Sequence, residues 1–363
     1  MKTYMFSLMI ICWFSCGTAT SSEQAKPLVV HTDTIPTPIN IPDTLSLNAV
    51  GDIMFGSSFP GTGNLAPNDG QDLMKFFTAS LQDADLTFGN SEGVFLDHGG
   101  VAKDSGDQVY CFREPTRYAK YFVDNGFDLL SVANNHVADF GEAGLQSTIK
   151  TLSALPLHFA GLQNFPTAIV KVRNLRIGFA AFAPHHGCIQ LNDIAAAKAA
   201  VIELKKQCDI VLVSFHAGAE GVKALHVPKH KELFYKQDRG DVYSFAHQMI
   251  DAGADILIGH GPHVARAMEL YKNKLIAYSL GNFCTYGMFN LKAECGIAPL
   301  LKIYVTGKGD FIKANITSIK QVGEGGPQPD PDGGAYKLIS TLTATDFPNS
   351  QLDFPGNGAV IRH

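Results

Sequence analysis

Short apolar runs alternate with amphipathic stretches along the chain from Leu45 onward. Six runs have the length and the flanking turn residues that are typical of buried strands. They are 45–52, 84–93, 128–136, 209–218, 254–263 and 274–283. The helical spacing of apolar positions predicts helices at 71–83, 115–125, 141–154, 192–207 and 241–252. Strands that alternate with helices in this way indicate an α/β fold with largely buried strands.

Two longer apolar segments are predicted to be hairpins. Residues 167–183 would turn at Asn174, and residues 300–319 would turn at 307–309. Beyond them the chain is rich in glycine and proline, and only 335–347 has a helical pattern, with no clear strand. We therefore expect one domain at 45–322 and a C-terminal extension at 323–363 that packs on it.

Every predicted strand of the alternating series ends in polar side chains. In open α/β sheets, ligands bind at the carboxyl ends of strands, where the loops form a crevice. A single polar residue at a strand end is usually part of a turn or a helix cap, but six consecutive cases favour a site. The residues are Asp52, Asn90, Glu92, Asn135, His136, His216, His260, His263 and Asn282.

The residue types in this series predict a metal site. Carboxylates, an amide carbonyl and imidazoles form a mixed oxygen and nitrogen shell suited to divalent Zn, Mn, Fe or Ni. The cysteines after the leader have no CxxC spacing, which favours core thiols over zinc ligands. The number of candidate ligands exceeds the need of one tetrahedral ion and favours two metals that share a carboxylate. Such a centre suits in-line displacement at a phosphoester.

Further residues are candidates for supporting roles, each with a structural alternative. Arg113 could clamp a phosphate or carboxylate, or form a surface salt bridge. Glu220 could orient His216 from behind, or be solvated in a loop. Asn282 could support the ligand shell, or only turn the chain. The polar insertion at 226–241 is expected to be a solvated excursion, with a place at the rim of the site as the alternative.

Several histidines outside the strand ends are not expected to bind metal, because they lie in loops without ligand spacing. They are His98, His185, His186, His226 and His230.

Composition excludes one class of partner. The 363 residues carry a net charge of −5 and are 17% charged, so the chain has no basic surface signal for nucleic acid. Apolar residues make up 45%, which is enough for a sizeable core.

The N-terminus has the pattern of an export signal. Lys2 precedes an apolar stretch at 5–14, which is too short to span a bilayer. The stretch ends in a segment that resembles a bacterial lipobox, so we expect a signal peptide at 1–22 with lipidation of Cys16. A Pro- and Thr-rich tether would follow at 23–44. The protein is then an exported, membrane-anchored lipoprotein of the cell envelope, or periplasmic or secreted if Cys16 is not lipidated.

Seven segments resemble, in order, the motifs of the CapA family of poly-γ-glutamate capsule biosynthesis proteins, which is related to the calcineurin-like metallophosphoesterases. The resemblance runs from about residue 47 to 283 and more weakly to about 319. The segments are GDIMFG, NSEG, FREP, ANNHVADFGEAGL, SFHAGAEG, IGHGPHVARAMELY and AYSLGNF.

The resemblance implies a four-layer α/β/β/α sandwich with a dinuclear metal centre between two sheets. It also implies that His136 is the acid near the leaving group, with Asp139 orienting it. By position, the implied metal ligands are Asp52, Glu92, Asn135, His216, His260 and His263.

This chain departs from the metallophosphoesterase pattern in ways that bear on the number of metals. Met54 stands where the first block has a histidine ligand, Val137 follows the Asn-His pair, and the last motif is one residue wider. We therefore expect one or two ions of Mn, Zn or Fe.

Two functions remain open at this point. The first is a phosphoester-type hydrolase that acts on a cell-envelope polymer or its precursor. The alternative is a non-catalytic metal-binding component that works with other capsule-synthesis proteins in polymer synthesis or export.

Overall fold

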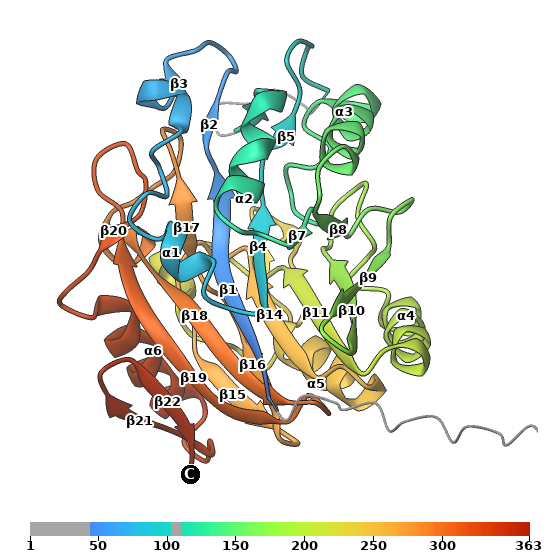
Figure 1. Ribbon diagram of the computed structural model, residues 1–363, viewed down its shortest axis with the longest axis vertical. Helices are drawn as coiled ribbons and strands as arrows, with labels where there is room; N and C mark the ends of the chain where they lie inside the picture. Colours follow the sequence, from blue (N-terminus) through green and yellow to red (C-terminus); the bar gives the residue numbers. More distant parts are fainter. Residues whose placement is uncertain (1–43, 103–109) are drawn as a thin grey trace, which may run out of the picture. The chain divides into compact units, whose positions relative to one another are not determined.

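The computed structural model describes residues 44–102 and 110–363 (Figure 1). The predicted signal peptide, the lipidation site Cys16 and the tether up to residue 43 lie outside the described residues. Within the described ranges, no helix is long and apolar enough to cross a membrane.

The larger of two main sheets is built around the first strand, β1, which runs parallel to its neighbours β4, β7 and β8. On its other edge β1 pairs antiparallel with β18 over its first half and parallel with β17 over its second half. The strands are β1 (Thr44–Met54), β4 (Leu86–Ser91), β7 (Leu129–Ser131), β8 (His158–Ala160), β17 (Asn282–Thr285), β18 (Ile297–Thr306), β19 (Phe311–Lys320), β20 (Gln328–Pro329), β21 (Leu352–Gly356) and β22 (Ala359–Arg362).

The smaller sheet has a parallel centre with an antiparallel strand at each edge. Its order is β15-β16-β14-β11-β10-β9. The strands are β9 (Thr167–Val172), β10 (Leu175–Phe182), β11 (Ile210–His216), β14 (Ile256–His260), β15 (Met268–Tyr271) and β16 (Lys274–Ala277). Three two-stranded ribbons lie apart from both sheets: β2 (Gly56–Ser57) with β3 (Asn64–Leu65), β5 (Val94–Phe95) with β6 (Arg113–Glu114), and β12 (Leu233–Phe234) with β13 (Gln237–Asp238).

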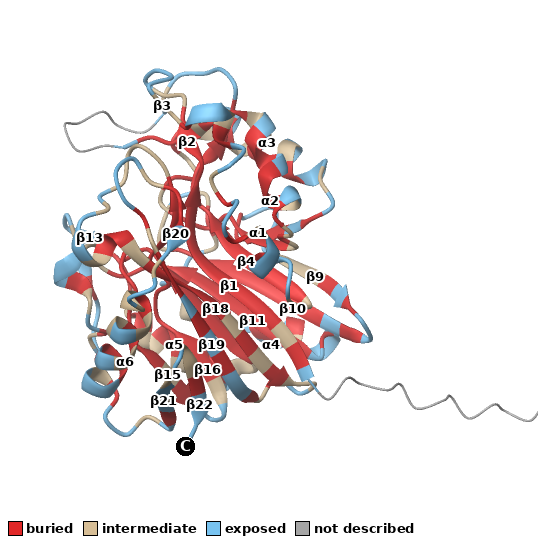
Figure 2. Cartoon of the chain, turned by 60° about the vertical axis from the view of Figure 1, so that its left-hand side comes forward, coloured by how far each residue is buried: buried red, intermediate tan, exposed pale blue. Residues whose placement is uncertain are grey.

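The two sheets face one another through a dry core and are covered by helices on their outer sides. Phe88 of β4 meets Phe179 of β10 with ring centroids 5.4 Å apart, which joins the sheets. Outside the small sheet, Phe215 packs against Phe245, and outside the large sheet Thr87 donates to a carbonyl of α1. Figure 2 shows the central strands buried and the helices exposed on their outer faces. The predicted four-layer α/β/β/α sandwich is confirmed.

The helices predicted at 141–154, 192–207, 241–252 and 335–347 are confirmed, whereas those predicted at 71–83 and 115–125 are reduced to short helices. They are α1 (Thr78–Leu81), α2 (Lys120–Asp124), α3 (Gly141–Ser153), α4 (Ile194–Gln207), α5 (Val242–Ala252) and α6 (Gly334–Asp346). Asp193 and Asp241 accept hydrogen bonds from the first-turn amides of α4 and α5, which fixes where these two helices begin.

The C-terminal segment departs from expectation because it contains strands. Residues after α6 form the β21–β22 hairpin, and β22 pairs antiparallel with β19 of the large sheet. Pro355 lies inside β21 and Asn357 has a φ of 52° at the turn, so the strand signal in the sequence is interrupted twice. Helix α6 contacts β18 and β19 of the large sheet and β15 of the small one.

The segment 274–283, expected to be one strand, is two strands in different sheets. It leaves the small sheet at Ala277 and enters the large sheet at Asn282, where β17 pairs with β1. Gly281 has a φ of 65° at this crossing, and a Cβ there would lie 3.0 Å from the amide of Ala265. Asn282 therefore begins a strand in place of ending one, and it lies opposite Asp52.

Glu114 is a fully buried acid that joins two loops of the large sheet. Its Oε2 accepts a hydrogen bond of 2.7 Å from the amide of Phe55, just after β1, and the carboxyl also accepts from the amide of Gly93, after β4. Burial raises the pKa of Glu114 from its usual 4.5 to about 8, because the two amides only partly compensate the loss of water. The side chain is therefore a neutral acid at neutral pH.

We predict that Glu114 makes the domain less stable as the pH rises. The folded protein keeps a proton that the unfolded chain releases near pH 4.5, so the stabilisation is present below this value and is lost as the pH rises toward 8. Glu114→Gln should remove this dependence, a difference on the order of 5 kcal/mol between pH 4 and 9. Urea unfolding at both pH values measures it. Glu142→Gln, at an exposed glutamate of α3, is the matched control; equal pH slopes for wild type and Glu114→Gln would contradict the prediction.

Candidate metal centre

The first strand delivers Asp52 to the junction of the two sheets. Its ladder with β17 shifts register between Asp52 and Ile53, and the amide of Asp52 donates to the carbonyl of Gly281 at 2.8 Å. A bulge of this kind re-aims a side chain at a strand end. Asp52 is fully buried.

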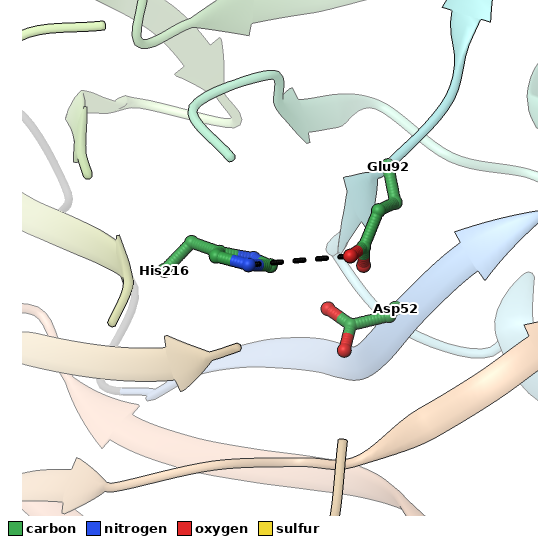
Figure 3. Close-up of side chains that lie close together, drawn as sticks. All are labelled: Asp52, Glu92 and His216. Atoms are coloured by element: carbon green, nitrogen blue, oxygen red, sulfur yellow. Dashed lines mark ion pairs between the residues drawn. The ribbon is translucent and has the colours of Figure 1, made fainter. Parts of the chain in front are cut away.

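Glu92 and His216 join Asp52 from neighbouring and facing strands. Glu92 follows β4, which is parallel to β1, and His216 is the last residue of β11 in the small sheet. One potential ligand atom from each of the three residues lies within 4.8 Å of the others, and all three residues are buried (Figure 3). The cluster therefore draws its members from the carboxyl edges of both sheets.

His260 and His263 close the cluster from the end of β14 and the loop that follows it. His260 Nδ1 lies 3.3 Å from Asp52 Oδ1, and His263 Nδ1 lies 3.0 Å from Asp52 Oδ2. His263 has a φ of 56°, which is uncommon for a residue with a side chain and is stabilised here by the surrounding contacts. Gly261 is required before it, because a Cβ there would lie 2.8 Å from the amide of Ala217.

The Oε1 atom of Glu92 faces three imidazole nitrogens but bonds to none of them. The Nε2 atoms of His263, His136 and His216 lie 3.5, 3.9 and 4.0 Å from it, beyond hydrogen-bond length. Ligand atoms that share one ion at roughly 2.1 Å lie about 3 to 4 Å from each other. Among the residues that the structure describes, Glu92 Oε1 and the Nε2 atoms of His216 and His260 have no hydrogen-bond partner. The donor set therefore fits a divalent transition metal.

Burial and neighbouring charges shift the pKa values of the acids and histidines in the cluster. Burial raises the pKa of Glu92, and the nearby charge of Asp52 raises it further. Burial opposes ionisation of Asp52 as well, but the adjacent imidazole of His260 and the hydrogen bond from His263 outweigh it and hold the pKa of Asp52 well below its usual value. Burial alone would lower the pKa of His263, yet Glu92 and Asp52 raise it to about 10. Neighbouring positive charge therefore decides whether a carboxyl group of this cluster is ionised.

His136 is held next to the cluster by Asp139. Its Nδ1 lies 2.8 Å from Asp139 Oδ2, which also accepts from the amide of Phe112, and the Phe112 ring stacks on the imidazole at 4.0 Å. The Nδ2 group of Asn135 lies 3.2 Å from His136 Nε2. With Nδ1 donating to Asp139, the Nε2 atom is directed toward Asn135 and Glu92, as an acid at this centre requires.

Of the three residues predicted to support the site, one contacts a histidine of the cluster and two bind other groups. Asn282 Oδ1 lies 3.1 Å from His263 Nδ1, so it supports the imidazole. Arg113 donates to Ser58 through Nε and Nη2 and to the carbonyl of Gly99 through Nη1. Glu220, expected to orient His216, instead forms a 2.8 Å ion pair with Arg239, which the sequence analysis did not single out.

Two residues near the centre had been given no role at it from the sequence. Asn90 Nδ2 lies 2.8 Å from Asp52 Oδ1, 3.4 Å from Glu92 Oε2 and 3.4 Å from His216 Nδ1, so it bridges the three buried residues. Its place at a strand end was the available signal. His185 was set aside as a loop residue, yet its ring lies 6.3 Å from that of His216, because β10 and β11 are neighbours and end at the same edge.

Cys188, Cys208, Cys284 and Cys295 are free and buried, and no thiol belongs to the described cluster. The site is therefore an oxygen and nitrogen centre, as expected.

The chain is similar in sequence to bacterial capsule synthesis proteins. The family model described as "Bacterial capsule synthesis protein PGA_cap" matches residues 46–286. The chain is 28% identical over 307 residues to the capsule biosynthesis protein CapA of Bacillus anthracis, covering 79% of this chain and 70% of that protein. It is 30% identical over 260 residues to the PGA biosynthesis protein CapA of Bacillus subtilis, covering 66% and 63%. A solved hypothetical protein from Thermus thermophilus is 16% identical, with a TM-score of 0.47, covering 77% of this chain and all of that one.

We predict that the centre carries roughly one or two transition-metal ions per chain when the protein is purified without chelators. His216→Ala should lose most of this metal, because it removes a buried nitrogen ligand that nothing nearby replaces. Elemental analysis measures both proteins. His158→Ala, at an exposed position of β8, should keep the wild-type content. Wild-type protein that is metal-free and does not respond to added Mn²⁺ or Zn²⁺ would refute the site.

Proposed function

Because the chain belongs to the bacterial capsule synthesis protein family PGA_cap, we propose that it is a metal-dependent hydrolase acting in capsule or cell-envelope polymer biosynthesis. Phosphoester-type chemistry fits the donor set best. The observation that carries this proposal is Glu92 Oε1, which is buried, has no hydrogen-bond partner among the described residues and faces three imidazole nitrogens at 3.5 to 4.0 Å. This arrangement suits a cation between carboxylate and imidazole ligands.

Asp52, Glu92, His216, His260 and His263 would hold the ion, and Asn135 lies beside them. When bound, a divalent ion such as Mn, Zn or Fe supplies Lewis acidity toward an ester oxygen and a nucleophile at neutral pH.

The protein's own groups supply proton transfer. Asp139 fixes His136 through Nδ1 and stabilises the imidazolium, whose Nε2 then carries the proton that a departing oxygen takes up. Asn135, an amide, has no proton to give at neutral pH; its Nδ2 group lies beside this nitrogen, and its carbonyl oxygen is the predicted further ligand of the ion. In this proposal His136 is the general acid, and its neighbours Asp139 and Asn135 are not.

A second candidate is a non-catalytic metal-binding component of poly-γ-glutamate-type capsule synthesis or export. It is favoured by the names of both Bacillus relatives, which state biosynthesis and not hydrolysis. Partners in this case are other capsule-synthesis proteins and the polymer itself.

The proposal includes export and membrane attachment through a lipid on Cys16, with the polymer or its precursor as the partner outside the cytoplasm. Cys16→Ser should release the protein from the membrane fraction, because the thiol is the acceptor of the lipid. Fractionation followed by immunoblotting measures this, with Cys12→Ser as the matched control within the leader. Membrane association that is unchanged in Cys16→Ser would rule out lipidation at this residue.

Loss of His136 separates catalysis from metal binding. His136→Ala should keep its metal while turnover of phosphoesters falls by about 10² to 10⁴, the usual contribution of a general acid. The loss should shrink for substrates with good leaving groups, which need little protonation. A panel of phosphomonoesters and phosphodiesters assayed with Mn²⁺, and again after chelation, measures it.

His158→Ala again serves as the control. If His136→Ala strips the metal, the imidazole is a ligand and its assignment as an acid is wrong. Wild-type protein that holds metal and turns over none of the panel would favour the non-catalytic component.

A further inference from the structure

The polar insertion at 226–241 is an ordered element of the site region. Its centre folds into the β12–β13 hairpin, in which Tyr235 and Lys236 adopt left-handed φ angles of 46° and 65°, as a two-residue turn of this kind requires. The hairpin is exposed at Leu233 and Tyr235, so this part is the solvated excursion that was expected, although it is folded. The hairpin leads directly into Arg239.

The backbone of Arg239 is attached to the loop that carries the metal ligands of the small sheet. Its carbonyl accepts a 2.8 Å hydrogen bond from the amide of Gly218, two residues after His216, and its amide donates to the carbonyl of Glu232 at 3.0 Å. The amide of Ala217, between His216 and Gly218, donates to the carbonyl of His260. The backbone of Arg239 is thus hydrogen-bonded to the segment that follows His216 and that also contacts His260.

The guanidinium of Arg239 is buried but only partly used. Its side chain is 2% exposed, and Nη1 donates to Glu220 Oε1 at 2.8 Å. No acceptor in the described ranges bonds to Nε or Nη2, both of which are shielded from solvent. The Phe234 ring lies 5.7 Å from the guanidinium carbon but accepts no hydrogen bond from Nε or Nη2, and an unsatisfied donor on a buried charged group is costly.

Arg266 shows how the same region satisfies an arginine that has a structural role. It is fully buried, its Nε donates to the carbonyl of Ala224, and its two terminal nitrogens bind Glu232 at 2.9 and 2.8 Å. Both arginines contact the loop after His216, but only Arg239 keeps two donors unused.

The charge of Arg239 acts on the metal centre. Burial is the main cause that lowers the pKa of His216; the charge of Asp52 opposes it, and the charges of Arg239 and His263 add to it. After burial and Asp52, the negative charge of Glu220 also raises the pKa of Glu92. The ion pair therefore lies within electrostatic range of both His216 and Glu92.

We propose that Arg239 is the cationic residue of an oxyanion-binding subsite beside the metal centre, where Nε and Nη2 donate to a phosphate or carboxylate group of the substrate. The planar guanidinium matches two oxygens of either anion. Glu220 holds the guanidinium in place through Nη1 and leaves the other edge for the ligand. The inference rests on the proposed function in that the metal centre holds the reacting group of the same substrate.

Titration calorimetry of the Mn²⁺-treated full chain with inorganic phosphate, and separately with γ-glutamylglutamate, tests the subsite. Arg239→Gln should weaken binding of the preferred anion about 10- to 100-fold, the effect of losing a charged hydrogen-bond donor. Glu220→Gln should bind the anion at least as tightly as wild type, because it removes a competing negative charge. Arg117→Gln, at an exposed arginine paired with Asp69, should leave binding unchanged.

The opposite effects of the two variants separate ligand binding from a structural role. If Arg239→Gln and Glu220→Gln weaken binding equally, the ion pair only holds the loop and the proposal fails. It also fails if wild type binds neither anion, or if Arg239→Gln binds as wild type does. Arg239→Lys should recover part of the affinity, because it restores the charge without the fork.

The two probes and the metal content distinguish the remaining outcomes. Dependence on Arg239 with phosphate alone assigns a phosphate group, and dependence with the dipeptide alone assigns a carboxylate. Anion binding that depends on Arg239 in protein that holds no Mn²⁺ would contradict the proposed metal centre while supporting the subsite.

Discussion

Two carboxylates without solvent contact, Asp52 and Glu92, lie side by side where the sheets meet, and their charge has to be compensated from within the protein. A buried anion is tolerated only next to cations, metals or good hydrogen-bond donors. The large sheet itself offers Asn90, and the imidazoles of His216, His260 and His263 come from the small sheet. The carboxyl edges of the two sheets therefore have to coincide for the fold to be stable, and metal binding and folding are expected to be coupled.

Much of this arrangement could be predicted from the sequence, because the side chains at the carboxyl ends of parallel strands necessarily lie along one edge. Asp52 and His216 follow from this rule, and His185 could have been added by applying it to β10. The path of Asn282 could not be predicted, since an apolar run gives no sign that its two halves pair in different sheets. The path of Asn282 is determined by the pairing of β17 with β1, which is a tertiary contact.

Arg239 illustrates a different limit of the sequence. It lies in a charged stretch that has no helical or strand-like spacing of apolar residues, which is typical of a solvated loop. Its burial depends on the hairpin and on a backbone hydrogen bond with Gly218, both of which are tertiary. The partner of Glu220 was unpredictable for the same reason. Two charged pairs therefore lie near the acidic centre with different proposed roles. His136 with Asp139 donates a proton, and Arg239 with Glu220 binds an anionic group of the substrate.

The crossing between Ala277 and Asn282 has a mechanical consequence. The chain passes from one sheet to the other immediately beside Asp52, and the carbonyl of Gly281 is bonded to the Asp52 amide. Sliding of one sheet over the other would have to deform this short segment and the hydrogen bond to Asp52. The crossing therefore couples the position of Asp52 in the large sheet to the small sheet, which carries His216 and His260.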